Sequence, residues 1–220
     1  MSPVKPSHFF GIDVGIQRGC VVAVLNHRGK IVTSHWFSRG NEADSIGDWM
    51  LDLCPDGAGV VGIDAPRCPL PRPRKWFWRS DRWRARGPRE AGRGRHCEVA
   101  IKALKLGNPQ WSPLASDPIP EWMALGFALF DRLQPALETY EVFPTASYRQ
   151  LHQAGTQSLE IDLSQCAPGP KDLLDACTAA ETVRRLKLGR GSLVGGGDGL
   201  GTIALPGPTS PHPVLQWPAS

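Results

Sequence analysis

The sequence lacks the features that would place this 220-residue chain in a membrane or cross-link it. No apolar run approaches the roughly 18 residues that a membrane-spanning helix needs. The first ten residues, MSPVKPSHFF, contain one lysine and no long apolar stretch, so we expect no signal peptide. Six cysteines are scattered without a C-x-x-C pair, which argues against a disulfide framework and against a standard zinc site. These absences predict a cytoplasmic protein with free thiols.

The composition is that of a globular protein. Apolar residues make up 41% of the sequence, which is too much for a disordered chain and enough for a folded core. A length of 220 residues fits one domain, and no internal repeat is visible. We expect a single domain over residues 1–205 that carries a basic insert at 66–97. The proline-rich segment 206–220 is predicted to be a flexible tail.

The positive charge of the chain is concentrated in one segment. The formal net charge is only +4, from 25 basic and 21 acidic side chains. Residues 67–95 hold eleven of the basic side chains and two of the acidic ones, a local net charge of +9. The rest of the chain carries 14 basic and 19 acidic side chains, a net charge of −5. A basic insert in an acidic body indicates a polyanionic partner.

The hydrophobic pattern of the first part of the chain indicates an α/β fold. Three apolar segments at 9–14, 20–25 and 31–37 are joined by short turns and predict an antiparallel meander. An amphipathic helix is predicted over 41–54, followed by a fourth strand at 59–64. Because this strand follows a helix, we expect it to run parallel to the first strand.

The pattern is weaker in the remainder of the chain. Regular periodicity is absent from the basic stretch between Pro66 and His96, so no helix or strand is predicted there. Beyond it, apolar spacing and turn residues predict three helices and two short strands. The helices are expected to begin near residue 97 and to span 120–137 and 170–188, and the strands to span 139–143 and 203–205.

Two aspartates lie at the ends of predicted strands. Asp13 lies near the end of the first strand in GIDVG, and Asp64 ends the fourth strand in GVVGIDAP. If these strands are parallel neighbours, their ends adjoin and the two carboxylates lie close together. Adjacent carboxylates repel each other unless a cation neutralises them, and oxygen ligands suit Mg²⁺ or Mn²⁺. The alternative is that each aspartate only caps a turn after its strand.

Three further acids are candidates for the same site. Glu141 is an acidic residue inside the predicted strand TYEVF. Asp172 and Asp175 are three residues apart in KDLLDACTAA, a spacing that lets both side chains of a helix face one site. The alternative for the helical pair is favourable electrostatics at a helix N-terminus.

The basic segment interleaves arginine with aromatic residues. Arginine binds phosphate with two hydrogen bonds, and aromatic rings can stack on exposed bases. The composition favours contacts with a nucleic-acid backbone without sequence specificity. The alternatives are that the aromatic residues pack the loop onto the body, or that the loop binds a small phosphorylated ligand. The candidates for nucleic-acid contact are Arg67, Arg74, Lys75, Trp76, Trp78, Arg79, Arg82, Arg84, Arg86 and Arg95.

The motifs GIDVG, GIDAP, EVFPTASY and KDLLDACTAA, in this order, resemble the family known as domain of unknown function 429, a group of predicted ribonuclease-H-like nucleases. The resemblance covers most of residues 9–206. It implies a mixed five-stranded sheet, with three antiparallel strands and additional parallel strands, flanked by helices. In the wider superfamily, which includes Holliday-junction resolvases, acids lie on the first strand, the fourth strand and a C-terminal helix. Those positions correspond here to Asp13, Asp64 and Asp175, with Asp172 completing an acid-x-x-acid pair.

The resemblance implies a nuclease that hydrolyses phosphodiester bonds with two Mg²⁺ or Mn²⁺ ions. Asp13 would bridge the ions, and Asp64 and Asp175 would each complete the ligands of one ion. Asp172 or Glu141 would be an outer ligand or would orient water. Nucleic acid is the expected partner, a membrane is not, and a homodimer is possible because resolvase-like enzymes are often dimers.

Two other functions remain open from the sequence. GIDVG followed by an apolar strand and turn also resembles the first phosphate loop of sugar kinases and actin-like ATPases, and GGGDG at 195–199 resembles their adenosine-binding glycines. Such enzymes have two similar cores, whereas this chain has one copy of the first-strand pattern. The other possibility is a non-catalytic module that binds nucleic acid and whose acids are structural.

Overall fold

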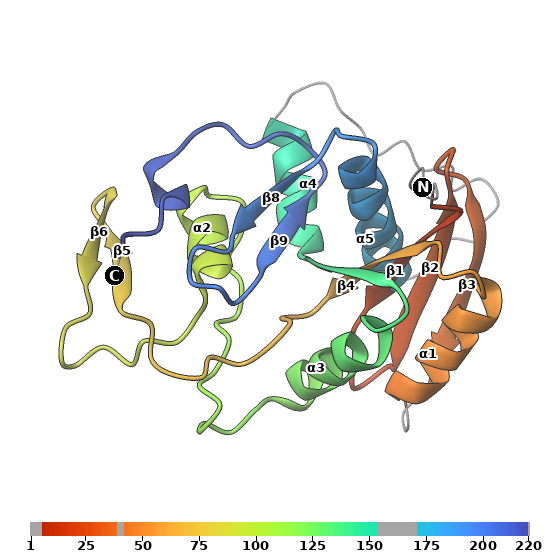
Figure 1. Cartoon of the computed structure of the whole chain (residues 1–220), viewed down its shortest axis with the longest axis horizontal. Helices are drawn as coiled ribbons and strands as arrows, with labels where there is room; N and C mark the ends of the chain where they lie inside the picture. The colour runs from red at the N-terminus through yellow and green to blue at the C-terminus, as the bar shows by residue number, and fades with distance from the viewer. Residues whose placement is uncertain (1–5, 39–41, 154–170, 220) are drawn as a thin grey trace.

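The computed structural model describes residues 6–38, 42–153 and 171–219 (Figure 1). Strands and helices are mixed along the chain, as expected for a protein that contains both. In chain order the elements are β1 (His8–Asp13), β2 (Cys20–Asn26), β3 (Ile31–Phe37), α1 (Glu42–Leu53), β4 (Gly59–Asp64), β5 (Trp76–Arg79), β6 (Arg82–Ala85), α2 (His96–Ala103), α3 (Glu121–Leu133), β7 (Glu138–Val142), α4 (Pro144–Gln153), α5 (Lys171–Lys187), β8 (Ser192–Gly195), β9 (Thr202–Leu205) and the short 3₁₀ helix η1 (Pro213–Leu215).

Within the described residues, seven strands form one mixed sheet in the order β3-β2-β1-β4-β7-β9-β8. The predicted meander is confirmed, because β2 is antiparallel to both β1 and β3. The predicted parallel pairing of the first and fourth strands is also confirmed. The prediction of five strands was wrong, because β9 adds to the sheet parallel to β7 and β8 pairs with β9 at the edge.

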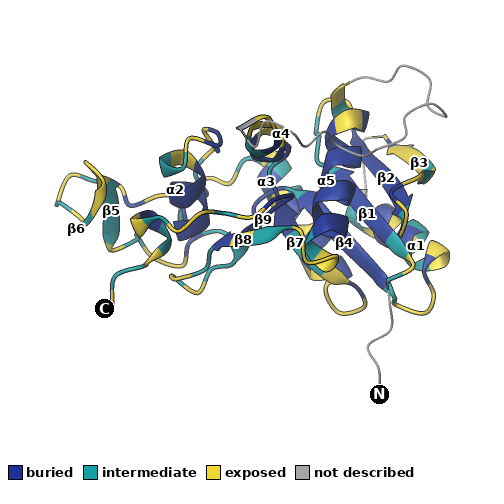
Figure 2. Ribbon diagram, turned by 90° about the horizontal axis from the view of Figure 1, so that it is seen from above, coloured by how far each residue is buried: buried dark blue, intermediate teal, exposed yellow. Residues whose placement is uncertain are grey.

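Helices cover both faces of the sheet (Figure 1). Alternate residues of the central strands, such as Phe10, Ile12 and Ile63, join side chains of α1 and α3 in one apolar core. On the other face, Phe9 and Val60 pack with alanine and valine residues of α5. Figure 2 shows these strands and α5 as mostly buried. None of the described helices has the length and apolar character needed to cross a membrane.

Two glycines let α5 lie unusually close to the sheet. A Cβ atom at Gly11 of β1 would lie 1.9 Å from the carbonyl oxygen of Ala176, and one at Gly62 of β4 would lie 2.7 Å from that of Ala179. Such distances are far below a van der Waals contact, so a side chain at either position would push α5 away. Gly11 and Gly62 of the two G-I-D motifs therefore form the surface against which α5 packs, here called the glycine track.

A second group of elements lies beside the sheet. It consists of α2, the β5–β6 hairpin and the C-terminal tail, which share an apolar cluster that includes Val99, Val214 and Trp83 (Figure 1). The prediction of a basic segment without regular structure was wrong, because this segment contains the hairpin. The segment predicted to be a flexible tail packs against this group, since Val214 is completely buried in the cluster.

The remaining predicted elements agree with the structure apart from their ends and two omissions. The helices expected near 97 and over 120–137 correspond to α2 and α3, and that over 170–188 to α5. Residue 170 itself lies outside the described residues. The helix α4, which begins directly at Pro144, and the edge strand β8 were not predicted.

Candidate metal centre

The two strand-end aspartates lie side by side. β1 and β4 are adjacent parallel strands, and Asp13 pairs in register with Asp64. Side chains alternate between the faces of a strand, so Asp13 lies on the same face as Gly11, two residues earlier, and Asp64 on the same face as Gly62. Both glycines face α5. The register and the glycine track therefore direct both carboxylates toward the N-terminal part of α5.

The first turns of α5 bring two further acids and one cation to this place. Asp175 is almost fully buried and accepts a hydrogen bond of 3.1 Å from the hydroxyl of Tyr148 on α4. The ammonium group of Lys171, one turn earlier, forms an ion pair with the second oxygen of Asp175. Asp172 lies 3.6 Å from the guanidinium of Arg18, in the loop after β1. The N-terminal end of the α5 dipole favours these carboxylates.

The acids interact electrostatically with one another. The pKa of Asp13 is raised to about 7, mainly by burial and in addition by the charges of Asp175 and Asp172, while the charge of Lys171 lowers it. Burial also raises the pKa of Asp64 well above its ordinary value, with additional contributions from Asp13 and Asp175. Protonation at neutral pH is the response of carboxylates that are crowded without enough positive charge. A bound cation would therefore stabilise the ionised form of these carboxylates.

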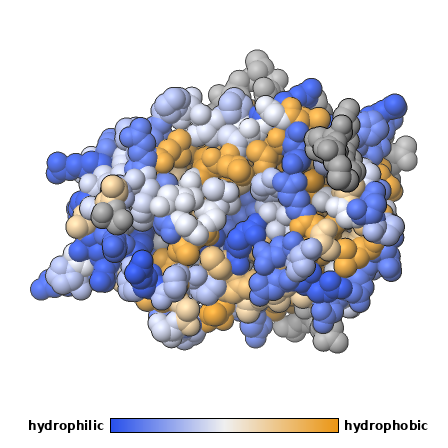
Figure 3. Space-filling model, in the orientation of Figure 1, coloured by the Kyte–Doolittle hydropathy of each residue, from blue (hydrophilic) through white to orange (hydrophobic). Residues whose placement is uncertain are grey.

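Two adjoining hollows give access to the cluster. One, of about 760 Å³, is lined by Asp13, the following loop with Arg18, Asp172 of α5 and Trp122 of α3. The other, of about 60 Å³, is lined by Asp64, Trp122 and Ile203 of β9. Figure 3 shows the corresponding face hollowed near its middle, between α3 and β9. Trp122 lines both hollows, and we call the two together the groove.

The ligand types beside this groove are those that a hard divalent cation prefers. Asp13, Asp64 and Asp175 offer carboxylate oxygens, the ligands that Mg²⁺ and Mn²⁺ prefer. In the described part of the chain, the only trio of acid, cysteine or histidine ligand atoms within 4.8 Å of one another is Cys97, Glu98 and Glu141. The three aspartates are thus spaced more widely than ligands gathered on a single ion.

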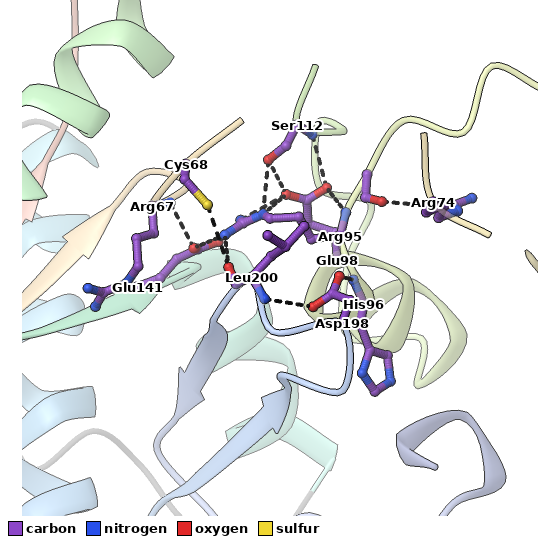
Figure 4. A network of polar contacts seen from close by, with 11 residues as sticks. Arg67, Cys68, Arg74, Arg95, His96, Glu98, Ser112, Glu141, Asp198 and Leu200 are labelled. Carbon is purple, nitrogen blue, oxygen red and sulfur yellow. Dashed lines mark hydrogen bonds and ion pairs between the residues drawn. The ribbon is translucent and has the colours of Figure 1, made fainter. Parts of the chain in front are cut away.

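Glu141 lies near Asp64 but is engaged elsewhere. Its two carboxylate oxygens accept hydrogen bonds of 2.8 and 2.5 Å from Nη1 and Nη2 of Arg95, at the start of α2 (Figure 4). Glu98 binds the other side of the same guanidinium, and Ser112 donates to Glu98 from both its backbone and its hydroxyl. The backbone N–H of Arg67 donates to Glu141 as well. The result is a buried network joining β7, α2 and two loops.

This network already contains its cation. Burial alone would lower the pKa of the Arg95 guanidinium, but Glu141 and Glu98 raise it well above its ordinary value. Burial raises the pKa of Glu141, and Arg95 offsets part of that increase. A buried charge is tolerated when it is paired and hydrogen-bonded on several sides. We therefore interpret Cys97, Glu98 and Glu141 as the surroundings of a buried arginine, although their spacing would also fit a metal.

The structure separates the predicted nucleic-acid contacts into three groups. Arg95 was predicted wrongly, because its side chain is 0% exposed and bound to two glutamates. Other candidates are partly buried and make contacts within the protein. Arg67 donates a hydrogen bond to the carbonyl of Thr139, and Arg84 forms an ion pair with Glu90. Arg74 lies over the ring of Phe77, and Trp78 packs on Trp83. Trp76 is also partly buried. The exposed candidates are Lys75, Arg79, Arg82 and Arg86.

Sequence reasoning missed three residues that lie beside the acids or line the groove. Lys171 could have been found from its i,i+4 spacing to Asp175, the distance at which a helical lysine and aspartate meet. Tyr148 and Trp122 belong to other helices, and no local signal in the sequence links them to the acids. Their positions follow only from the packing of α3 and α4.

Comparison with known proteins does not identify the chain. No protein-family model matches this sequence, and no curated protein matches it either. The resemblance to domain of unknown function 429 therefore stays a prediction based on motifs. Two of those motifs, GIDVG and GIDAP, have a structural explanation in this chain, since their glycines admit α5 and their aspartates face it.

Proposed function

We propose that this protein is a divalent-metal-dependent nuclease of the ribonuclease-H-like type. The observation that carries the proposal is the pairing of Asp13 with Asp64 at the carboxyl ends of two parallel strands, beneath the acids of α5. Carboxylates crowded in this way are costly unless a cation is bound. The basic segment that follows Asp64 would attract the phosphates of the substrate.

The order of the elements supports this proposal. The motif resemblance implies three antiparallel strands, a helix, a parallel fourth strand, a further parallel strand and a C-terminal helix carrying acids. The chain has this order in β1, β2, β3, α1, β4, β7 and α5, with the basic segment inserted between β4 and α3. We interpret β8 and β9 as an extension of that core.

Each residue of the groove has a defined role in the proposal. Asp13, Asp64 and Asp175 would hold Mg²⁺ or Mn²⁺, which when bound would stabilise charge on the phosphate and acidify a water molecule. Tyr148 fixes one oxygen of Asp175 through its hydroxyl. Lys171 supplies positive charge to the cluster, and Asp172 is oriented by Arg18. Lys171 would have to release Asp175 for both of its oxygens to bind a metal.

Glu141 has a different role in the proposal than the sequence suggested. Both of its oxygens are bound to Arg95, so it does not need a metal. It also accepts the backbone N–H of Arg67, three residues after Asp64. We assign Glu141 to positioning the loop that leaves β4, and thereby the groove beside Asp64.

The test is metal-dependent cleavage together with metal binding. Single-stranded, duplex and branched DNA and RNA are incubated with the protein and Mg²⁺ or Mn²⁺, and the thermal shift caused by Mn²⁺ is measured in parallel. Asp13→Asn is expected to lower cleavage by more than about a hundredfold and to remove the thermal shift. Asp52→Asn, which neutralises an exposed aspartate of α1, is the matched control and should change neither.

The proposal makes a clear negative outcome possible. Cleavage that persists in Asp13→Asn would show a contaminating nuclease or another site. A wild-type protein whose melting temperature does not respond to Mg²⁺ or Mn²⁺, and which cleaves none of the substrates, would contradict the proposal. Turnover of ATP with a small acceptor would instead favour the kinase that the sequence left open.

A further inference from the structure

A second cavity lies away from the carboxylate groove. It has a volume of about 420 Å³ and is formed by three segments: the start of the basic segment at 70–76, the glycine turn at 197–200 and the tail at 217–219. Cavities of several hundred Å³ are of the size that holds a small organic ligand such as a nucleotide. Its lining includes three cationic residues, two tryptophans, three prolines and a single acid, and the other residues are aliphatic or small.

Three cations stand within four residues on one wall of this cavity: Arg72, Arg74 and Lys75. Arg72 and Lys75 are exposed, and neither has a carboxylate partner among the residues that the structure describes. Arg74 is held in place, because its guanidinium lies 4.3 Å from the ring centre of Phe77 and 5.2 Å from that of Trp111. Its buried Nε has no hydrogen-bond partner in the described structure.

Two tryptophans supply the aromatic walls. Trp217 comes from the tail and is fixed by ring contacts with Trp83 at 4.9 Å and His96 at 4.8 Å. Gly197 admits it, since a Cβ atom at Gly197 would lie 2.2 Å from Cβ of Trp217. Trp76 is half-buried, and no ring contact is found for it within the described residues. A ring without such a contact at a cavity wall is suited to stacking on a base.

The one acid of the cavity is a fixed hydrogen-bond acceptor. Asp198 accepts from the backbone N–H of His96 at 2.6 Å and from that of Leu200 at 3.1 Å (Figure 4). These bonds orient its carboxylate without neutralising it. With three cations and one anion, the wall still carries a net positive charge. Asp198 can accept a further hydrogen bond from an amino group of a base or from a sugar hydroxyl.

We propose that this cavity binds an unpaired nucleotide of single-stranded nucleic acid. Arg72 and Lys75 contact the phosphate at the open edge, and the base stacks against Trp76 and Trp217. A base in a duplex is already stacked and paired, so its face cannot enter such a cavity. The inference rests on the proposed nuclease function in one respect: the bound strand is the substrate only if the protein is a nuclease.

The cavity is close enough to the carboxylates to act on the same strand. Leu70, on the cavity wall, is six residues from Asp64, and six extended residues span at most about 20 Å. A strand of about ten nucleotides is therefore long enough to occupy both sites. One end would be held by the cavity while a phosphodiester lies over the acids.

The experiment measures binding without cleavage. Fluorescence anisotropy of labelled dT and rU strands of about ten nucleotides, and of a blunt duplex of the same length, is recorded with the Asp13→Asn protein in EDTA. Arg72→Ala combined with Lys75→Ala is expected to weaken single-strand binding tenfold or more. Arg89→Ala combined with Arg93→Ala removes the same charge from exposed positions of the same segment and should weaken it less than threefold.

A second variant tests the stacking. Trp76→Leu keeps an apolar side chain and is expected to weaken single-strand binding about tenfold while leaving duplex binding unchanged. The inference is overturned if the two double variants lose affinity equally, if Trp76→Leu binds like its parent, or if the duplex binds as tightly as the single strands. Melting temperatures of the variants show that each is folded.

The failure of this inference differs from the failure of the proposed function. If the protein binds single strands through Arg72 and Trp76 but never cleaves them with Mg²⁺ or Mn²⁺, nucleotide binding in the cavity is supported and the nuclease function is contradicted. A protein that cleaves with metal, and whose single-strand binding is unaffected in the cavity variants, keeps the nuclease and loses the cavity. The dT and rU strands separate a DNA ligand from an RNA ligand.

Discussion

Asp13 on β1 and Glu141 on β7 are acids of one sheet, separated by β4, and their surroundings differ. Glu141 is paired with the guanidinium of Arg95. Asp13 has no such partner among the described residues; it lies beside Asp64, and its pKa is raised to about 7. An acidic residue is thus paired with a buried arginine in one place and lies beside another carboxylate in the other.

The raised pKa of Asp13 predicts a specific dependence of stability on pH. The folded chain binds a proton at Asp13 more tightly than the unfolded chain does, so protonation stabilises the fold below about pH 4. This contribution is lost as the pH rises through about 7. In EDTA, the melting temperature of Asp13→Asn should therefore exceed that of the wild type by more at pH 8 than at pH 5.

The stabilisation of the fold by divalent metal should increase with pH, whereas the stabilisation by protonation of Asp13 decreases. Metal binding competes with the proton, so the thermal shift of the wild type in Mn²⁺ should grow between pH 6 and pH 8. Asp52→Asn again serves as the control. In EDTA, a difference in melting temperature between Asp13→Asn and the wild type that is the same at pH 5 and pH 8 would contradict the raised pKa.

The buried Arg95 makes a second prediction at the level of single residues. Arg95→Met leaves Glu98 and Glu141 buried without their cation, which should lower the free energy of unfolding by about 3–5 kcal/mol. Arg93→Met removes an exposed partner of Asp117 and should cost less than about 1 kcal/mol. Urea unfolding measures both values. Equal losses would mean that the buried network contributes no more than a surface ion pair.

At the level of elements, α5 connects the core to the site. Its buried face rests on Gly11 and Gly62, and its first two turns carry Lys171, Asp172 and Asp175. The height of the helix above the sheet therefore sets the distance between its acids and those of the strands. The packing of α5 and the position of its acids relative to Asp13 and Asp64 therefore depend on the same two glycines.

Gly11→Ala should separate α5 from the sheet. The added methyl group would lie 1.9 Å from the carbonyl oxygen of Ala176, so backbone must move, at a cost of about 3 kcal/mol in unfolding free energy. The Mn²⁺ thermal shift should weaken as well. Gly189→Ala is the contrast: no atom lies within 4 Å, and only its φ of +71° costs about 1 kcal/mol. Chemical denaturation with and without Mn²⁺ compares the two; an unchanged metal response in Gly11→Ala would contradict this coupling.

The β5–β6 hairpin shows why local pattern was insufficient in the basic segment. Its turn residues, Ser80 and Asp81, both have positive φ, of 50° and 55°. Hairpin turns of this kind usually contain glycine or asparagine, and neither occurs here. The strand sequences WFWR and RWRA also lack the regular alternation of exposed and buried residues that indicates a strand.

At the level of the whole molecule, the tail closes the part of the structure that lies beside the sheet. Val214 is buried against α2, and Trp217 packs on Trp83 of the hairpin. The tail therefore packs against the hairpin and forms part of the wall of the cavity that we propose binds a nucleotide. These contacts join positions that are more than 100 residues apart in the sequence.

Val214→Asp should loosen the hairpin without unfolding the sheet. A charge buried in this cluster has no partner, so the tail should detach and trypsin should cleave the arginine-rich hairpin faster. Val32→Asp places the same charge at a 52% exposed position of β3 and should leave the digestion unchanged. Mass spectrometry of the fragments locates the cuts. A digestion pattern for Val214→Asp that equals that of the wild type would show that the tail is not needed to hold the hairpin.

The sequence by itself determined the elements whose signal is local. The meander, α1, β4, α3 and α5 follow from apolar periodicity, and the partition of charge can be counted directly. The position of Asp13 and Asp64 at strand ends, and hence their adjacency, followed from the same pattern. The strands β8 and β9 were harder to place because four-residue elements carry too few residues to establish a period.

Only the tertiary structure decided which charges are buried and with which partners. Arg95 belongs by sequence to a basic, solvent-exposed segment, yet its partner Glu141 lies 46 residues away on β7. The tail likewise has a disordered composition, and it is ordered by apolar contacts with α2 and the hairpin. The free energy of a charge or an apolar side chain depends on what surrounds it in space, and neighbours along the chain do not reveal those surroundings.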